Sequence, residues 1–215
     1  RVFIRSLCDQ VVALREAGNQ VVVVSSGAAA AGRDVLSLSS RPSDMATLQA
    51  CASVGQTALT EAYAEVLGER GVLCGQVLLT RRDVVDRDAY LNARNTLTRL
   101  LELGAVPVVN ENDTVSVAEF TFGDNDMLGA IVSALVGADL YIILSDVCGL
   151  YTANPSVDPT ATLIPEVTQV DRSISAVAGD SSSSFGTGGM SSKVRAARGM
   201  MAAGIPTVIC EGRRP

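Results

Sequence analysis

Histidine and tryptophan are absent from this chain of 215 residues, and aromatic residues make up only 4% of it. The lack of histidine excludes every mechanism that needs an imidazole base, Ser-His-Asp hydrolysis among them. With so few aromatic side chains, the hydrophobic core must consist of Val, Leu, Ile and Ala. Any catalysis therefore depends on carboxylates, cationic side chains, backbone groups or a bound metal ion.

The cysteines show neither a metal-binding nor a disulfide pattern. They are odd in number, none belongs to a Cys-x-x-Cys pair, and no histidine accompanies them, so the sequence contains no recognisable zinc site. Scattered thiols of this kind are typical of buried free cysteines in a cytosolic protein. The five residues are Cys8, Cys51, Cys74, Cys148 and Cys210.

Charge and hydropathy exclude two further classes of protein. The formal net charge of −6 and the isoelectric point near 4.7 argue against a nucleic-acid-binding surface. No apolar run reaches ~18 residues without a charge, which argues against a membrane-spanning helix. No signal peptide is visible, because residues 1–5 already have a helical pattern. We expect a cytoplasmic protein with no membrane partner.

Short apolar runs alternate with longer helical patterns along the chain. Hydrophobic residues make up 47% and the mean hydropathy is +0.30, which fits a sheet buried on both faces. The alternation predicts one α/β domain over residues 1–215, with an open, mostly parallel sheet sandwiched between helices. The expected strands are 21–24, 72–79, 106–109, 140–144 and 207–210, with an extended piece at 163–167, and the expected helices are 45–67, 90–103, 127–136 and 191–203.

Small polar residues follow three of the expected strands. Ser25-Ser26-Gly27 follows the first, Asn110-Glu111-Asn112-Asp113 follows the third, and Ser145-Asp146 follows the fourth. In open α/β sheets the ligand crevice lies at the carboxyl ends of the strands. Each group alone could be a helix cap or a turn, but three together favour a binding site.

Residues 110–126 are dense in carboxylates and amides, with five acidic residues and three asparagines around a hairpin-like stretch at 117–122. The spacing does not match a calcium-binding EF-hand loop. A polar cup for a small zwitterion fits better, with asparagine amides on its carboxylate and an aspartate on its ammonium. Asp126 also lies where it could cap the helix that begins at Met127.

Lys193 is the only lysine, and it ends a glycine-rich turn, residues 186–193, that leads into a helix. Free backbone N–H groups and the helix dipole at such a place suit phosphate. A cation in the first turn opposes the dipole, so Lys193 makes sense where an anion lies beside it. A solvated surface lysine is the alternative. There is no Walker A sequence, and no Gly-x-Gly-x-x-Gly follows the first strand, so any phosphate site belongs to another class.

Eight short motifs together carry a resemblance. The chain resembles the glutamate 5-kinases of the amino-acid kinase family, and the motifs stand in family order over nearly its whole length. They are Val23–Ala28, Ala52–Gln56, Leu78–Arg81, Leu91–Thr96, Asn110–Asp113, Gly123–Asp126, Gly149–Thr152 and Gly186–Met190.

The resemblance implies the amino-acid kinase (carbamate kinase-like) fold and transfer of the γ-phosphoryl of ATP, with Mg²⁺, to the side-chain carboxylate of L-glutamate, the first step of proline biosynthesis. Ser26, Asp113 and Asn125 would contact glutamate, supported by Asn110. Asp126 would orient lysine around the transferring phosphoryl, and Lys193 would neutralise its charge. The nucleotide would lie against Ser145, where the family usually has Thr, and against Asp146, Thr187, Gly188, Gly189, Met190, Ser191, Ser192 and Lys193.

The resemblance also implies features that lie outside the printed residues. The family opens with a strand ending in Lys-x-Gly-Ser/Thr, whose lysine contacts the ATP phosphates, and this sequence begins after that strand. We expect a chain truncated at its N-terminus, and poorly active as it stands. Bacterial members often carry a C-terminal PUA domain. Members are inhibited by proline and form dimers or tetramers.

Two alternatives remain open at this point. Another member of the same family would phosphorylate N-acetylglutamate, aspartate, carbamate or a nucleoside monophosphate. A non-catalytic sensor would bind glutamate or proline and regulate a partner. Fold alone does not choose among them.

Overall fold

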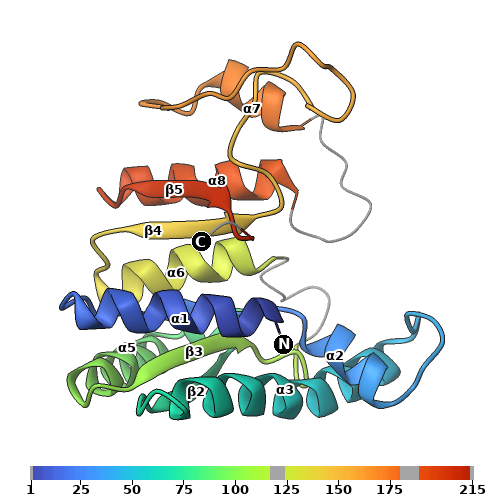
Figure 1. The fold of residues 1–215 in the computed structure, drawn as a ribbon, viewed down its shortest axis with the longest axis vertical. Coiled ribbons are helices and arrows are strands. Elements are labelled where there is room, and N and C mark those ends of the chain that lie inside the picture. Colours follow the sequence, from blue (N-terminus) through green and yellow to red (C-terminus); the bar gives the residue numbers. More distant parts are fainter. Residues whose placement is uncertain (1, 117–123, 180–188, 214–215) are drawn as a thin grey trace. The chain divides into compact units, whose positions relative to one another are not determined.

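The computed structural model describes residues 2–116, 124–179 and 189–213. The chain divides into two compact units, Arg1–Phe122 and Gly123–Pro215. Each is described by itself, and Figure 1 labels the elements of both. The expected hairpin at 117–122 lies outside the described residues.

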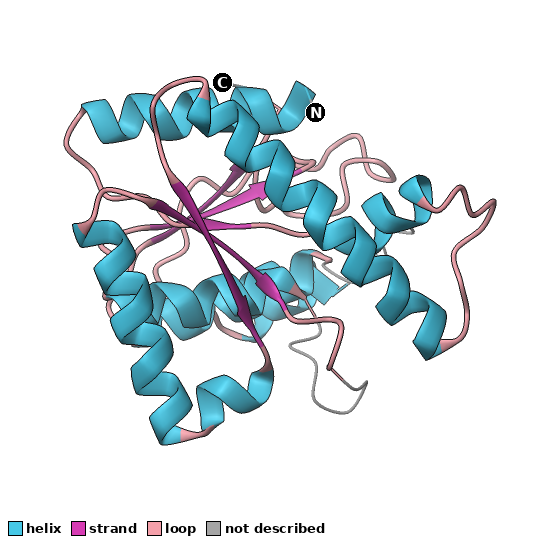
Figure 2. Cartoon of the chain, turned by 90° about the horizontal axis from the view of Figure 1, so that it is seen from below, coloured by secondary structure: helices cyan, strands magenta, loops and turns pink. Residues whose placement is uncertain are grey.

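The first unit is built on a parallel sheet in the order β1-β3-β2. Figure 2 draws the strands of both units in magenta. The strands are β1 (Val23–Val24), β2 (Cys74–Leu79) and β3 (Val106–Glu111). Val108 of β3 pairs with Val23 on one side and with Gln76 on the other. Every residue of β3 is buried, as expected for a central parallel strand covered on both faces.

Five described helices belong to this unit: α1 (Val2–Glu16), α2 (Ala28–Val35), α3 (Met45–Gly68), α4 (Arg81–Val85) and α5 (Arg87–Glu102). Side-chain caps begin two of them, because Asp44 accepts from Thr47 N and Asp86 accepts from Ala89 N. The predicted helix at 45–67 is confirmed. The helix expected at 90–103 begins earlier, at Arg87. Helix α4 was not predicted; Asp83 accepts from Thr80 N at 2.6 Å at its start.

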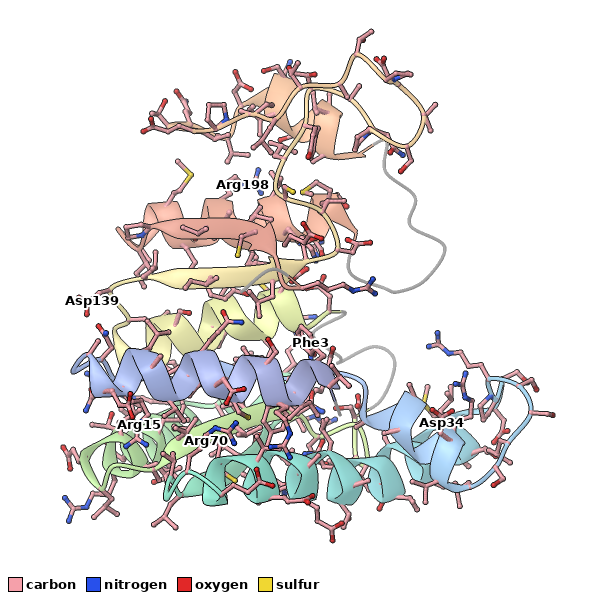
Figure 3. The ribbon with its side chains drawn as sticks, viewed as in Figure 1. Phe3, Arg15, Asp34, Arg70, Asp139 and Arg198 are labelled. Atoms are coloured by element: carbon pink, nitrogen blue, oxygen red, sulfur yellow. The ribbon has the colours of Figure 1, made fainter. Side chains whose placement is uncertain are left out.

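Helices cover both faces of this sheet. On one face Val106 and Val108 pack with residues of α1 and α3, including Cys8, Tyr63 and Leu67. On the other face Leu100 of α5 lies over Gly75, where an added Cβ would come within 2.9 Å of the leucine. Arg70, labelled in Figure 3, follows α3 and bonds Asp9 of α1. These layers leave the carboxyl ends of the strands for the loops that carry the predicted site.

Two glycines allow α2 and α3 to pack closely (Figure 1). A Cβ on Gly55 would lie 1.8 Å from the carbonyl oxygen of Ala28, and one on Gly32 would lie 1.7 Å from that of Cys51. No larger residue fits either place without moving backbone. The start of α2, directly after Ser26 and Gly27, is therefore held against α3.

The second unit contains the parallel pair β4 (Tyr141–Ser145) and β5 (Thr207–Glu211), with Tyr141 opposite Thr207. Its described helices are α6 (Asn125–Val136), α7 (Arg172–Gly179) and α8 (Met190–Ala202). Ala130 of α6 and Ala196 of α8 are both buried and share a cluster with Ile143. Helix α7 was not predicted; its Ala178 packs with Leu150 and Val194.

The α/β class and the parallel pairing expected from the sequence are confirmed. The helix-capping prediction for Asp126 is wrong. Asp124 is the N-cap of α6 and accepts from Met127 N at 2.8 Å, whereas Asp126 lies within the first turn. Among the described helices, none combines the length and the apolar character that a bilayer crossing requires.

Candidate functional site

The carboxyl end of β1 presents a serine turn. Ser25 is buried; its N–H donates to Val109 O at 2.9 Å, and its hydroxyl lies 3.1 Å from the hydroxyl of Tyr63. Ser26 and Gly27 are exposed. Gly27 precedes α2 with φ of 95°, a left-handed conformation that favours glycine. The predicted binding residue Ser26 is thus exposed, directly after a serine whose backbone is bonded to β3.

Asn110, at the carboxyl end of β3, is 3% exposed and has its amide oriented by two bonds. Its Oδ1 accepts from Glu111 N and its Nδ2 donates to Gln56 Oε1, each at 2.9 Å. The side-chain amide of Asn110 is therefore fixed at the end of β3.

Asp113 lies in the turn that follows β3. Asn112 N donates to Leu79 O at 2.9 Å, which ties the turn to β2. The Asp113 carboxylate is half-buried, and no hydrogen bond or ion pair within the described ranges engages it. Burial raises the pKa of Asp113. A carboxylate held in this way can take a cationic group of a ligand.

In the second unit the predicted catalytic pair is in contact. Lys193 Nζ donates to Asp126 Oδ2 at 2.9 Å, and both side chains are largely buried, at 12% and 14% exposure. Ser192 Oγ donates to the same oxygen at 2.8 Å. The sequence favoured an anion beside Lys193, and the carboxylate of Asp126 is one. Three predicted residues from two helices therefore meet at one carboxylate oxygen.

The nucleotide-binding residues predicted before and within α8 are partly described. Gly189 is the N-cap of α8 and offers no side-chain cap. Ser192 N donates to Gly189 O at 3.1 Å, so within the described ranges the N–H groups of Met190 and Ser191 are left for another acceptor. Met190 and Ser191 lie in the first turn of α8, and Ser192 and Lys193 follow. Thr187 and Gly188 lie outside the described residues.

Asp124 and Asn125 stand at the start of α6. Asp124 uses one oxygen to cap the helix and the other to accept from Arg195 of α8 at 3.2 Å. Asn125, predicted to contact the substrate, is the first helical residue. Helices α6 and α8 are therefore joined by two carboxylates one residue apart, Asp124 and Asp126.

Tyr141 supports this arrangement and was missed by sequence reasoning. Its hydroxyl donates to the backbone oxygen of Asp126 at 2.8 Å. Burial, with negative charge from Asp126 and Asp124 nearby, raises the pKa of Tyr141, so the phenol remains a donor. The ring fits because residue 129 is glycine, where a Cβ would lie 2.4 Å from the hydroxyl. A lone glycine in an apolar helix was the available signal.

Ser145 and Asp146 end β4 as predicted. Ser145 is buried and its Oγ donates to Asp146 Oδ1 at 3.2 Å, while Asp146 is exposed. Gly212 N donates to Ser145 O at 2.8 Å and so continues the pairing with β5. This polar pair therefore lies at the end of β4, beside Gly212, which follows β5.

Residues 1–211 match the sequence model of the amino acid kinase family. The chain belongs to the amino acid kinase family.

Relatives within the amino acid kinase family carry more specific names. The chain is 49% identical over 212 residues to the glutamate 5-kinase of Trichlorobacter lovleyi, covering 99% of this chain and 56% of that protein. It is 52% identical over 204 residues to the glutamate 5-kinase of an Azoarcus species, covering 95% and 55%. The chain thus spans about half the length of the curated relatives it matches.

Solved structures agree on the fold. The isopentenyl phosphate kinase substrate complex aligns over 100% of this chain and 83% of that one, with a TM-score of 0.65 and 18% identity. At this identity the likeness shows the amino acid kinase fold alone. Within the described part of the chain, no three acidic or thiol side chains gather where a metal ion could bind.

Proposed function

We propose that this chain is the kinase domain of a glutamate 5-kinase, which transfers the γ-phosphoryl of ATP to the γ-carboxylate of L-glutamate and so begins proline biosynthesis. Relatives of that name at about half identity support the proposal. The contact that carries it is the 2.9 Å bond between Lys193 and Asp126 at the start of α8. One cation held beside uncapped N–H groups suits a phosphate that is changing charge.

The acceptor is proposed to bind at the carboxyl ends of β1 and β3. The resemblance also assigns Asn125, the first residue of α6, to the substrate. The half-buried carboxylate of Asp113 is suited to the glutamate ammonium. Ser26 offers an exposed hydroxyl to a carboxylate, and Asn110 orients the strand end. A zwitterion needs both kinds of group, and these residues supply both.

The nucleotide is proposed to bind at the start of α8 and the end of β4. The N–H groups of Met190 and Ser191 in the first turn of α8 suit the phosphates, and Ser145 and Asp146 suit the nucleoside. The lack of an acidic cluster in the described ranges fits Mg²⁺ that arrives on the ATP phosphates, as this ion binds few protein ligands. When bound, Mg²⁺ would supply charge neutralisation between the phosphates.

This chemistry needs no general base. A side-chain carboxylate with a pKa of roughly 4.3 is already ionised at neutral pH and can attack the γ-phosphorus directly. Catalysis then consists of positioning and of stabilising charge on the transferring group. A chain without histidine can do this.

The test is a hydroxamate assay on the full natural polypeptide. The protein is incubated with ATP, Mg²⁺, hydroxylamine and one acceptor at a time: L-glutamate, N-acetylglutamate, aspartate or carbamate. Colour with L-glutamate alone is expected, because hydroxylamine traps the acyl phosphate. Colour only with another acceptor would keep the family and overturn the substrate. No colour, with glutamate or proline still bound in a calorimeter, would identify a sensor.

Three further proposals rest on the same resemblance. Proline is proposed as a feedback inhibitor, the protein as a homodimer or homotetramer, and the cytoplasm as its location. Adding proline to the assay above and measuring mass in solution by light scattering would test the first two.

A further inference from the structure

Helix α3 carries three polar side chains at intervals of seven residues: Gln49, Gln56 and Tyr63. Seven residues are nearly two helical turns, so the three lie along one face. We call them the α3 ladder. The ladder shares its helix with the motif Ala52–Gln56, to which the proposed function assigns no role.

Each member of the ladder contacts a different segment at the carboxyl end of the first sheet. Gln49 Nε2 donates to Ser116 O at 3.0 Å, in the turn that contains Asp113. Gln56 Oε1 accepts from Asn110 Nδ2 at 2.9 Å. Tyr63 lies 3.1 Å from the hydroxyl of Ser25, next to Ser26. One helix face therefore contacts every segment of the first unit that is proposed to bind the acceptor.

The middle contact has a direction. Gln56 Nε2 donates to Gln76 Oε1 at 3.2 Å and to Thr60 Oγ1 at 3.1 Å, so its oxygen is left for Asn110. Thr60 also donates to Gln76 Oε1. Gln76 acts in these bonds only as an acceptor, and it is exposed. The exposed oxygen of Gln76 thus helps to fix the amide of Gln56 with its oxygen toward Asn110.

The helix that carries the ladder is itself fixed in place. Gly55, directly before Gln56, lets α3 approach Ala28 O at the start of α2, as the clash of an added Cβ shows. Gly55 therefore lies against the start of α2, which follows the serine turn, and its neighbour Gln56 contacts Asn110 at the end of β3.

We infer that Gln49, Gln56 and Tyr63 are positioning residues for the acceptor, and that Gln56 determines the orientation of the Asn110 amide. This inference rests on the proposed function, because it concerns the affinity for the same acceptor. It adds a cause for that affinity which lies outside the binding residues themselves.

Three variants of the full natural polypeptide test the bonds that run from Gln76 through Gln56 to Asn110. Gln56→Met removes all three side-chain bonds of Gln56 and leaves the Asn110 N–H without this acceptor. Gln76→Met acts from the surface, so it removes the outer acceptor without risk to the core. Gln76→Glu keeps an acceptor at the same place. We expect the KM for glutamate to rise about tenfold, about threefold and less than twofold, respectively, with kcat and the KM for ATP within twofold of wild type.

The outcomes separate this inference from the proposed function. Wild-type turnover of glutamate tests the function, and the ranking of the variants tests the ladder. Equal glutamate KM values in all four proteins would overturn the ladder alone, as would equal losses in kcat and in the KM for ATP, which indicate a general structural defect. If the wild type uses another acceptor, the same ranking with that acceptor supports the ladder. If no acceptor reacts, the side-chain amide resonances of Asn110 decide: they should shift in both methionine variants and stay in Gln76→Glu.

Discussion

The two units hold their predicted site residues by different interactions. In the first unit the contacts are neutral, between the amides of Asn110 and Gln56 and the hydroxyls of Ser25 and Tyr63. In the second they are ionic, with Lys193 on Asp126 and Arg195 on Asp124. Neutral contacts fix dipoles without competing for a ligand's charges, so Asp113 remains for a cation. Ion pairs keep a buried cation in place before any phosphate arrives.

The largest expected effect comes from removing the cation of the second unit. Lys193→Ala should lower kcat about 1,000-fold, because a preorganised charge is lost and the carboxylate of Asp126 is left without it. Hydroxamate formation under saturating substrates measures this. Arg198→Ala is the matched control: Arg198 is an exposed cation on the same helix, labelled in Figure 3, and its removal should leave kcat unchanged. A loss in both variants would show that net charge, and not position, matters.

A packing change in the first unit should cost stability. Gly55→Ala should lower the free energy of unfolding by about 3 kcal/mol, because the new methyl group would overlap Ala28 O and force α2 away from α3. Urea denaturation followed by circular dichroism measures it. Gly68→Ala, at the open end of the same helix, meets nothing within 4 Å and should be neutral or gain up to ~1 kcal/mol. Equal stability of the two variants would contradict the observed packing.

The carboxylate of Asp113 should strengthen the binding of glutamate at a cost in the stability of the fold at pH 7. Asp113→Asn should raise the KM for glutamate roughly thirtyfold, the loss of one charge-assisted hydrogen bond, and should not lower the melting temperature at pH 7. Glu61→Gln, an exposed carboxylate on α3, is the control and should change neither value.

The pH dependence has a defined sign. Burial raises the pKa of folded Asp113 above its unfolded value. Its contribution to stability is therefore present when the carboxyl is protonated, at low pH, and is lost as pH rises through the folded pKa. The wild-type KM for glutamate should rise as pH falls through that same raised pKa, and the variant should lack this step. A wild-type step at the ordinary pKa of an exposed aspartate would contradict this explanation.

The smallest effect on kcat should come from removing a neutral hydrogen bond in the second unit, the one that Tyr141 donates to Asp126 O. Tyr141→Phe keeps the ring against Gly129 and removes the bond to Asp126 O. We expect kcat to fall about threefold, near the net value of one hydrogen bond. Tyr90→Phe is the control, because the Tyr90 hydroxyl makes no hydrogen bond within the described ranges. A kcat equal to wild type in Tyr141→Phe would show that the ion pair alone positions Asp126.

Much of the fold could be predicted from local patterns. The apolar run 106–109 and the helical pattern 45–67 have strong periods, and β3 and α3 lie there. Helices α4 and α7 could not be predicted with the same rules, since they are short and have few buried residues. Asp124 and Asp126 are equally good caps by composition. In the structure Asp124 has the extended backbone of an N-cap and accepts from Met127 N.

The candidate site was predicted residue by residue but not as a set of contacts. The lone lysine, the missing histidine and the polar residues after the strands identified Lys193, Asp113 and Ser145 as chemistry-bearing groups. Sequence spacing could not reveal that Asp126 meets Lys193, since 67 positions separate them.

The amino-acid sequence by itself determined the kind of sheet, because the alternation of strands and helices follows from short-range periodicity. It also contains the glycines that the packing and the turn need, Gly27, Gly55 and Gly129. The tertiary structure decided what each glycine faces, which carboxylate holds the cation, and that Gln49, Gln56 and Tyr63 reach three separate segments. These are long-range contacts, and they form only when packing brings distant segments within hydrogen-bond distance.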